Sequence, residues 1–380
     1  MPPAPDLAAM ACLESVHDLL DWQKYQETAA GGVMSIWLVF IQFILTAGFA
    51  TCVLATANAQ PAIETFYRGK NIQLVIGSNV GGGYDFYGRL VGRYIGRYIP
   101  GKPNVVVANM AGAGGNTAAG YVYSVAPRDG TVIAASSSGS LLDALIGDKT
   151  IVRYEPLKFN FIGSANSEVS ICVIRRDAEV QTFEDAFTKE ALIGSSGGTT
   201  RDLPTALNRV LGTKFKLISG YPGTREIMLA MEKGEVQGLC GIGYTSTISQ
   251  RPDWLKPDSP MRALVQESSR PLPELDRTGV PLAINYARTP EQRQILDIIY
   301  AQLLFTRPFM MAPDVSKERV EAIRTAFTQA LADPELIAEG ARQNLIIDAM
   351  SGAELESRIR GLYEQPPEVI AKVRKAMEMQ

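Results

Sequence analysis

Residues 72–85 read Ile-Gln-Leu-Val-Ile-Gly-Ser-Asn-Val-Gly-Gly-Gly-Tyr-Asp, and this stretch decides the fold. Its first five residues form a short apolar run, which is typical of a buried strand. Three consecutive glycines follow the strand. Apolar residues then recur with the spacing of one helix face, at Tyr87, Leu90, Val91, Tyr94 and Tyr98. The stretch therefore predicts a strand, a glycine loop and a helix.

The glycine loop has the backbone chemistry of an anion site. Unpaired N–H groups at a helix N-terminus, together with the helix dipole, favour a negative charge. Glycine also lets a ligand approach the backbone closely. A tight turn that binds nothing explains this stretch equally well. The loop is neither a P-loop nor the dinucleotide-binding Gly-x-Gly-x-x-Gly motif, because its glycines lack both spacings.

The N-terminal segment has the pattern of an export signal. The chain has 380 residues, and residues 33–59 contain no charged side chain. This apolar segment ends in Ala57-Asn-Ala-Gln60, a small-x-small cleavage pattern. We therefore interpret residues 1–59 as an extension plus a signal peptide. An uncleaved membrane anchor is the alternative, since about 20 apolar residues can span a bilayer.

Composition excludes several classes of chemistry. The net charge of −3 suggests neither nucleic acid nor an anionic membrane as a partner. The only histidine, His17, precedes the predicted cleavage site, which removes histidine triads and histidine metal sites. The cysteines lack metal-ligand spacing, and no obvious base accompanies the many Ser and Thr residues of the loops. We expect a binding protein rather than an enzyme, with no metal and no cofactor.

Two of the four cysteines, Cys172 and Cys240, lie beyond the predicted cleavage site. Both sit in apolar, strand-like runs. An exported protein can pair them in a disulfide. Two buried free thiols are the other interpretation, since cysteine is among the most buried residue types. The sequence leaves both open.

The order of predicted elements indicates two α/β domains. Strands at residues 72–76, 105–107 and 131–135 alternate with helices, which predicts a parallel sheet. The alternation restarts after residue 167. A proline-rich segment at 252–290 is predicted to lack regular elements. The helices that follow it have no strands between them, and we expect them to return to the first sheet. The predicted domains are 60–166 with 285–380, and 167–284.

Small polar loops follow the strands in both predicted domains. In open α/β sheets, ligands bind beyond the carboxyl ends of the strands. Two such sets of loops facing each other form a cleft at a domain interface. Backbone N–H groups and hydroxyls both donate hydrogen bonds, so the expected ligand is an anion.

Several motifs in order carry a family resemblance. They are Phe66-Tyr-Arg-Gly-Lys-Asn-Ile72, Gly81-Gly-Gly-Tyr-Asp85, Asn109-Met-Ala-Gly-Ala-Gly-Gly115, Ala126-Pro-Arg-Asp-Gly-Thr131, Gly194-Ser-Ser-Gly197, Tyr221-Pro-Gly223, Gly234-Glu-Val-Gln237 and Ala332-Asp-Pro-Glu335. Over nearly the whole mature chain, the sequence resembles the Bug family, the TctC-type substrate-binding proteins of tripartite tricarboxylate transporters.

The resemblance implies the type II periplasmic-binding-protein fold, with two βαβ domains, a hinge and a ligand cleft between them. It implies that facing loops hold a carboxylate through backbone N–H groups and ordered water. Carried over by position, the ligand-binding residues are Val80, Gly81, Gly82, Gly83, Tyr84, Asp85, Phe86, Ser137, Ser138, Ser195, Ser196, Gly197, Gly198, Thr199, Thr200, Tyr221, Gly223 and Thr224. Tyr244 is a weaker candidate.

The function implied by the resemblance is capture of a tricarboxylate, dicarboxylate or aromatic acid in the periplasm. The protein, a monomer, would deliver it to the integral membrane permease subunits of the transporter. A periplasmic sensor that feeds a signalling receptor is an alternative. An exported α/β enzyme acting on an anionic substrate is a further one.

Some positions depart from the family pattern or have a second interpretation. Where many relatives carry a histidine after the second loop, this chain has Arg201, which either contacts the carboxylate or pairs with Asp202. Asp85 is also the predicted N-cap of its helix. Arg225 and a stripe at Arg89, Arg93 and Arg97 are expected to be solvated surface.

Overall fold

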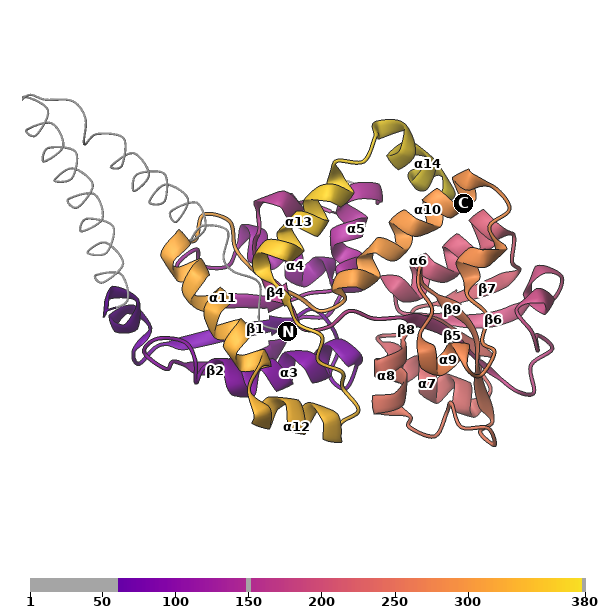
Figure 1. The fold of residues 1–380 in the computed structure, drawn as a ribbon, viewed down its shortest axis with the longest axis horizontal. Coiled ribbons are helices and arrows are strands. Elements are labelled where there is room, and N and C mark those ends of the chain that lie inside the picture. The colour runs from indigo at the N-terminus through magenta and orange to yellow at the C-terminus, as the bar shows by residue number, and fades with distance from the viewer. Residues whose placement is uncertain (1–60, 148–151, 378–380) are drawn as a thin grey trace, which may run out of the picture. The chain divides into compact units, whose positions relative to one another are not determined.

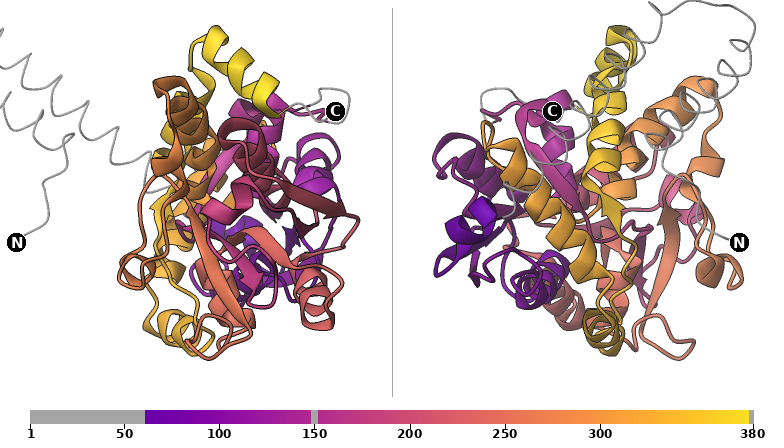
Figure 2. Two further views of the ribbon diagram at one scale, coloured as in Figure 1. Left: turned by 90° about the vertical axis from the view of Figure 1, so that its right-hand side faces the viewer. Right: turned by 60° about the vertical axis from the view of Figure 1, so that its left-hand side comes forward.

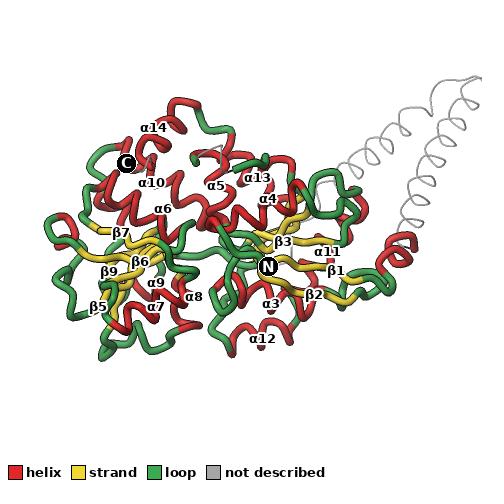
Figure 3. The backbone as a smooth tube through the Cα atoms, turned by 180° about the vertical axis from the view of Figure 1, so that it is seen from behind, coloured by secondary structure: helices red, strands yellow, loops and turns green. Residues whose placement is uncertain are grey.

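The computed structural model describes residues 61–147 and 152–377, which form two β-sheets covered by helices (Figure 1). The predicted extension and signal peptide lie outside the described residues. Within the described residues, no helix is long and apolar enough to cross a membrane. The two sheets appear as separate groups of strands in the backbone trace (Figure 3). The fold is the expected mixed α/β type.

The first sheet has six strands in the order β11-β4-β10-β3-β1-β2. Strands β1 (Asn71–Ile76), β2 (Asn104–Asn109) and β3 (Val132–Ala135) are parallel, as predicted. β10 (Pro308–Met311) runs antiparallel to β3 and to β4 (Asn160–Ser164), and β11 (Met350–Ser351) runs antiparallel to β4.

The prediction that the C-terminal region contributes no strands is wrong. β10 and β11 have four and two residues. Strands this short give no periodic signal in the sequence. Their pairing with β3 and β4 makes the sheet mixed rather than wholly parallel.

The second sheet has five strands in the order β7-β6-β8-β5-β9. β6 (Ala191–Ser195) pairs in parallel with β7 (Phe215–Ser219) and β8 (Gly238–Gly243). β5 (Ser170–Arg175) pairs antiparallel with β8 and with β9 (Met261–Glu267). β9 lies inside the proline-rich segment that we predicted to lack regular elements, so that prediction missed a strand.

Helices cover both faces of the six-stranded sheet (Figures 1 and 2). α3 (Gly83–Ile95) buries its predicted face against β1 and β2, and α4 (Asn116–Ser124) packs on β3. α11 (Lys317–Leu331) and α13 (Gly352–Tyr363) pack on β4, as expected of the C-terminal helices. α12 (Pro334–Arg342) packs on α3 instead.

Other helices border the second sheet. α6 (Thr199–Ala206) contacts β6, β7 and β8, while α7 (Thr224–Lys233) contacts β6 and β8 from the opposite face (Figure 1). α14 (Pro367–Met377) packs on α10 (Pro290–Ala301), α6 and α5 (Ser138–Ile146). The short helices α8 (Tyr244–Gln250) and α9 (Pro273–Asp276) complete this part. The boundaries at 166/167 and 284/285 stay predictions.

The arginine stripe at Arg89, Arg93 and Arg97 is not simply solvated. Arg97 pairs with Glu335 of α12 at 2.8 Å, and Arg93 pairs with Glu339 of the same helix. Arg89 donates to Asp85 Oδ1 at 2.9 Å. The first two side chains remain half exposed, so these pairs add little stability but orient α12 on α3.

Cys172 of β5 and Cys240 of β8 form a disulfide between neighbouring strands. Both residues are fully buried in the apolar cluster on one face of the five-stranded sheet. The sequence left open a disulfide or two free thiols, and the structure contains the disulfide.

Candidate functional site

A cavity of about 270 Å³ lies between loops of the two sheets. Most of its lining residues follow β1, β2, β3, β6 and β7, and others lie at the end of β8. This is the position that the strand–loop–helix rule predicts for a ligand in an open α/β sheet. Polar groups also reach it from the two segments that connect the sheets, at Glu168 and Arg307.

The loop after β1 presents backbone rather than side chains. Gly82 is the N-cap of α3, and no side chain caps this helix among the described residues. The first N–H groups of a helix have no acceptor within the helix, so those of Gly83 and Tyr84 are free to bind a ligand. Gly82, Gly83 and Tyr84 all line the cavity.

Asp85 shapes this loop and does not cap the helix. Its carboxylate accepts the Gly81 N–H at 2.9 Å and the Asn109 amide at 2.8 Å, and it pairs with Arg89. Asp85 is 2% exposed and lies outside the cavity lining. Its predicted role as N-cap is wrong, because Gly82 occupies that position.

The loop after β6 is built in a similar way. Gly198 is the N-cap of α6 and has φ +55°, and again no described side chain caps the helix. The Thr200 hydroxyl donates to Gly197 O at 2.8 Å and accepts the Ser196 N–H at 3.0 Å. A Cβ on Gly114 would lie 2.7 Å from the Gly198 nitrogen, so the loops after β2 and β6 meet closely.

A third helix also begins at the cavity. Gly223 is the N-cap of α7, without a side-chain cap among the described residues, and Thr224 and Arg225 line the cavity. The Asn79 amide, from the loop after β1, donates to Pro222 O at 3.0 Å. The two sheets therefore touch across the cavity through their loops.

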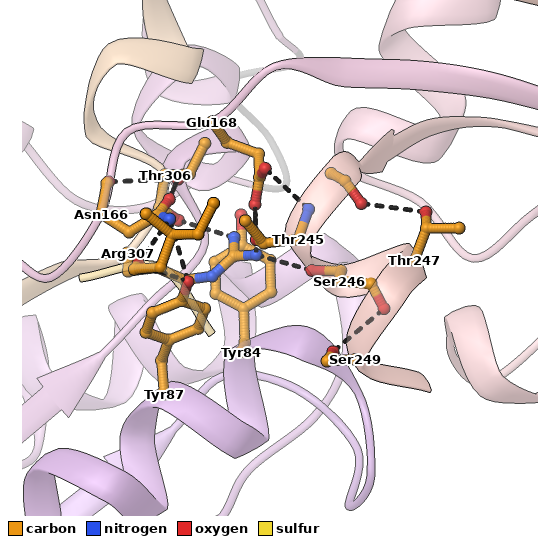
Figure 4. Close-up of polar contacts among 12 residues, drawn as sticks. Tyr84, Tyr87, Asn166, Glu168, Thr245, Ser246, Thr247, Ser249, Thr306 and Arg307 are labelled. Atoms are coloured by element: carbon orange, nitrogen blue, oxygen red, sulfur yellow. Dashed lines mark hydrogen bonds and ion pairs between the residues drawn. The ribbon is translucent and has the colours of Figure 1, made fainter. Parts of the chain in front are cut away.

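A buried ion pair lies at one side of the cavity (Figure 4). Arg307 and Glu168 are 5% and 8% exposed, and their Nη2 and Oε2 atoms are 3.5 Å apart. Glu168 accepts hydrogen bonds from the backbone N–H and the hydroxyl of Thr245. Arg307 donates to the Ser246 hydroxyl at 2.8 Å.

Burial raises the pKa of Glu168, and Arg307 and the hydrogen bonds of Thr245 oppose that rise. A second buried acid, Glu267 of β9, has its pKa raised to about 8 by burial, with only the Gly241 N–H opposing. Gly241 lines the cavity, so Glu267 lies directly behind the wall.

The cavity lining includes many of the predicted binding residues: Val80, Gly82, Gly83, Tyr84, Ser137, Ser196, Gly197, Gly198, Thr199, Thr200, Tyr221, Gly223 and Thr224. It does not include Gly81, Asp85, Phe86, Ser138, Ser195 or the weaker candidate Tyr244. These residues support the loops or the core. For example, the Ser195 hydroxyl accepts the Gly197 N–H. Ligand contact by the lining residues stays a prediction.

Arg201 does not line the cavity. Its guanidinium donates to Asp143 Oδ1 at 2.8 Å and to Asp202 Oδ1 at 2.7 Å. Of the two roles expected for Arg201, the structure therefore shows the ion pair with Asp202. Arg225, expected to be surface, is exposed but also lines the cavity beside Gly81.

Other lining residues were missed from the sequence. They are residues 77–79, 111–115 and 241–243 with Glu168, Ser170, Pro222, Glu226, Ser246, Leu303, Thr306 and Arg307, besides Arg225. The loop at 111–115 had a signal, since it is a second glycine loop after a strand. The ion pair of Arg307 with Glu168 left no signal in the sequence, because the two residues lie 139 positions apart. Among the described residues, no group of three acidic, cysteine or histidine side chains is placed to hold a metal.

Comparison with known proteins gives matches to solved structures alone; no protein-family model and no curated protein matches the chain. A TctC solute-binding protein from Polaromonas is 18% identical, with 81% of this chain and 99% of that chain covered and a TM-score of 0.55. The periplasmic binding protein BugD is 18% identical, with coverages of 82% and 98% and a TM-score of 0.63.

MatC from Rhodopseudomonas palustris, solved with bound malate, is 17% identical, with coverages of 81% and 99% and a TM-score of 0.62. At these identities the likeness concerns the fold. It agrees with the resemblance that the motifs carry and with two sheets flanking one cavity. The chain therefore has the two-domain fold of the TctC and Bug periplasmic solute-binding proteins.

Proposed function

We propose that this protein captures a small carboxylate in the cavity between its two sheets and delivers it to the permease subunits of a tripartite tricarboxylate transporter. One observation carries the proposal. Three helices, α3, α6 and α7, begin at the same cavity with a glycine N-cap and no side-chain cap among the described residues. Their free N–H groups converge on the space where a ligand would lie.

The electrostatics of these helix starts select an anion. Each helix N-terminus is equivalent to about half a positive charge. Ordinary helix starts use a Ser, Thr, Asp or Asn side chain to satisfy these N–H groups. Glycine at all three N-cap positions leaves these donors to a ligand, and a carboxylate is a small anion whose oxygens accept several such bonds.

The structural neighbours support the class of ligand. MatC binds malate, and another R. palustris neighbour, 16% identical with a TM-score of 0.62, was solved with adipate. Both ligands are small carboxylates. The same neighbours support a role in binding rather than catalysis and a periplasmic location, reached through the predicted signal peptide. A monomer suffices, because both walls of the cavity come from one chain.

The test is a thermal-shift series with mono-, di-, tri- and aromatic carboxylates, with nucleotides as the contrast. A ligand at 100 times its Kd adds about 2.7 kcal/mol to the free energy of unfolding. We expect a shift with at least one class of carboxylate. A shift with nucleotides alone would favour an enzyme acting on a phosphate ester and contradict the proposal.

A variant at Gly82 locates the binding site. A Cβ there would lie 3.7 Å from its nearest neighbours, Asn79 O and Thr224 Oγ1, and φ is −89°, so the backbone tolerates a side chain. We expect Gly82→Val to abolish the carboxylate shift while keeping the unliganded midpoint. Gly361→Val is the matched control, because Gly361 lies on the exposed side of α13 with open space around it.

A further inference from the structure

We propose that the protein has a second ligand site, at the outer edge of the five-stranded sheet, and that this site binds an anion with an apolar body, such as an aromatic carboxylate. The starting observation is a cavity of about 620 Å³ beside β9, which we call the edge cavity. It shares no lining residue with the cavity between the two sheets. The inference therefore goes beyond the proposed function and does not depend on it.

The edge cavity lies at the far end of the five-stranded sheet. The loops that follow β6 and β7 border the cavity between the sheets. β9 runs antiparallel to β5, β5 runs antiparallel to β8, and β8 is parallel to β6. β9 therefore begins at the opposite end of the sheet, where its residues 262–264 line the edge cavity.

The edge cavity exists because the outer edge of β9 is only partly covered. β9 is the last strand of its sheet. The Gln266 N–H donates to Pro281 O at 2.8 Å, so residues 281–282 cover the end of the strand. Residues 278–280 fold back on α9 instead of continuing this pairing, with Gly279 at φ +75°. The first half of β9 is therefore left beside a gap.

The walls of the edge cavity are largely apolar. Phe183 and Leu264 belong to the apolar cluster on one face of the sheet, and Leu275 belongs to another cluster of this part of the protein. All three are buried and line the cavity. The Tyr286 ring stands edge-on to that of Phe183, with ring centres 4.8 Å apart. Apolar and aromatic walls with few polar groups, at this volume, are typical of small-molecule sites.

The edge cavity also carries an excess of positive charge. The charged side chains in its lining are Arg176, Arg262 and Glu184. Burial lowers the pKa of Arg262, and the positive charge of Arg176 lowers it further. The two arginines therefore lie close enough to repel each other. An anion bound by both guanidinium groups would relieve this repulsion.

The two guanidinium groups have donors for such an anion. The Nε and Nη2 atoms of Arg262 are buried and have no partner among the described residues, which leaves Nη1 as the nitrogen that a ligand can reach. Arg176 donates from Nε to Ser259 O at 2.7 Å, which fixes its side chain and leaves both Nη atoms for a ligand. Three nitrogens can thus meet the oxygens of one carboxylate.

The nearby acids are engaged elsewhere. Glu184 accepts a hydrogen bond from the Tyr286 hydroxyl. Asp185, the acid whose charge acts on Arg262, lies outside the lining and pairs with Lys189 at 2.8 Å. The positive charge of the edge cavity is therefore left for a ligand.

The test uses a matched pair of aromatic ligands on the exported form of the full chain. Titration calorimetry would measure Kd for 2-naphthoate and for 2-naphthamide, which has a similar shape but no charge. We expect the acid to bind the edge cavity about 10- to 100-fold more tightly than the amide, the range for hydrogen bonds to charged groups.

The same titrations on Gly82→Val separate the two cavities. Gly82 lines only the cavity between the sheets, so a side chain there obstructs that cavity alone. Binding of 2-naphthoate to the edge cavity should be unchanged in this variant.

Arg262→Gln and Arg176→Gln, each made in the Gly82→Val background, should weaken 2-naphthoate by about 10-fold and 2-naphthamide by less than about threefold. Arg262→Gln removes two buried nitrogens without partners, so its unfolding midpoint should not fall. Arg176 is exposed, so its variant decides the question if Arg262→Gln misfolds. Arg277→Gln, an exposed arginine outside the lining, controls for net charge.

Three results would overturn the inference. The first is no binding of 2-naphthoate to Gly82→Val at millimolar concentration. The second is equal affinity for the acid and the amide, since the arginines would then not recognise the charge. The third is unchanged affinity for the acid in both arginine variants, which would place the anion elsewhere. A failure of carboxylates to bind between the sheets would contradict the proposed function and leave this inference standing.

Discussion

At the scale of single residues, glycines and buried polar side chains have different roles in this site. Glycines such as Gly82 and Gly198 line the cavity and are the N-caps of α3 and α6. Behind them, Asp85 and Thr200 use their side chains to hold the loops in shape. Polar side chains in these loops therefore act as supports, while the residues without side chains face the cavity.

Glu267 makes stability depend on pH. Its folded pKa of about 8 lies above the ordinary 4.5 because the carboxyl is buried. Between these values the folded protein keeps a proton that the unfolded chain has lost, so stability falls as pH rises through this window. We expect Glu267→Gln to flatten this fall, as measured by urea unfolding from about pH 5 to 8.5. Parallel wild-type and variant curves would contradict the assignment to Glu267.

At the scale of elements, the disulfide joins strands that are neighbours in the sheet but distant in sequence. Cys172 and Cys240 are 68 residues apart, and β6, α6, β7 and α7 all lie between them. The bond therefore closes a loop that contains most of the parallel part of the five-stranded sheet. Cross-linking a loop of this length restricts the unfolded chain considerably.

Reduction should lower the free energy of unfolding by about 4 kcal/mol, the chain-entropy estimate for a loop of this length. Denaturant unfolding with and without a phosphine reductant measures this difference. The double variant Cys172→Ala with Cys240→Ala is the control, since its midpoint should not respond to the reductant. An unchanged wild-type midpoint, with peptide mapping showing that the bond was reduced, would contradict the prediction.

At the scale of the whole described molecule, the proposed function predicts that ligand binding and contact between the sheets are coupled. Loops of the two sheets meet beside the cavity, at Gly114 with Gly198 and at Asn79 with Pro222. A ligand that touches both sets of helix starts stabilises the arrangement in which these loops meet. We therefore expect contacts between the loops to contribute to the affinity for the proposed ligand without touching it.

Asn79→Ala should weaken all carboxylate ligands alike, by about 2- to 10-fold, because it removes one neutral hydrogen bond between the sheets. The Asn79 bond is exposed, so the unliganded midpoint should stay the same. Asn104→Ala, which removes an exposed asparagine bond within the first sheet, should leave affinity unchanged. Loss of affinity for dicarboxylates alone in Asn79→Ala would contradict this role.

The sequence alone determined the local units of this protein. The apolar run at 72–76, the three glycines and the helix face from Tyr87 onward predicted β1, its loop and α3, because each is specified by residues within one turn or strand of each other. The loop that contains Gly194-Ser-Ser-Gly197 and precedes α6 was predicted for the same reason. These loops supply most of the predicted lining of the cavity.

Only the tertiary structure decided what those loops face. Arg307 reaches Ser246 across 61 residues and Glu168 across 139, and no spacing in the sequence records such a meeting. Strands β10 and β11 are too short for a periodic pattern and exist because β3 and β4 offer them partners. Arg201 was expected either to contact the carboxylate or to pair with Asp202, and its second ion pair, with Asp143 of α5, forms only in the tertiary structure. Residues that are neighbours in the sequence determine local periodicity. The charge balance of the cavity depends on contacts that form only when distant segments fold together.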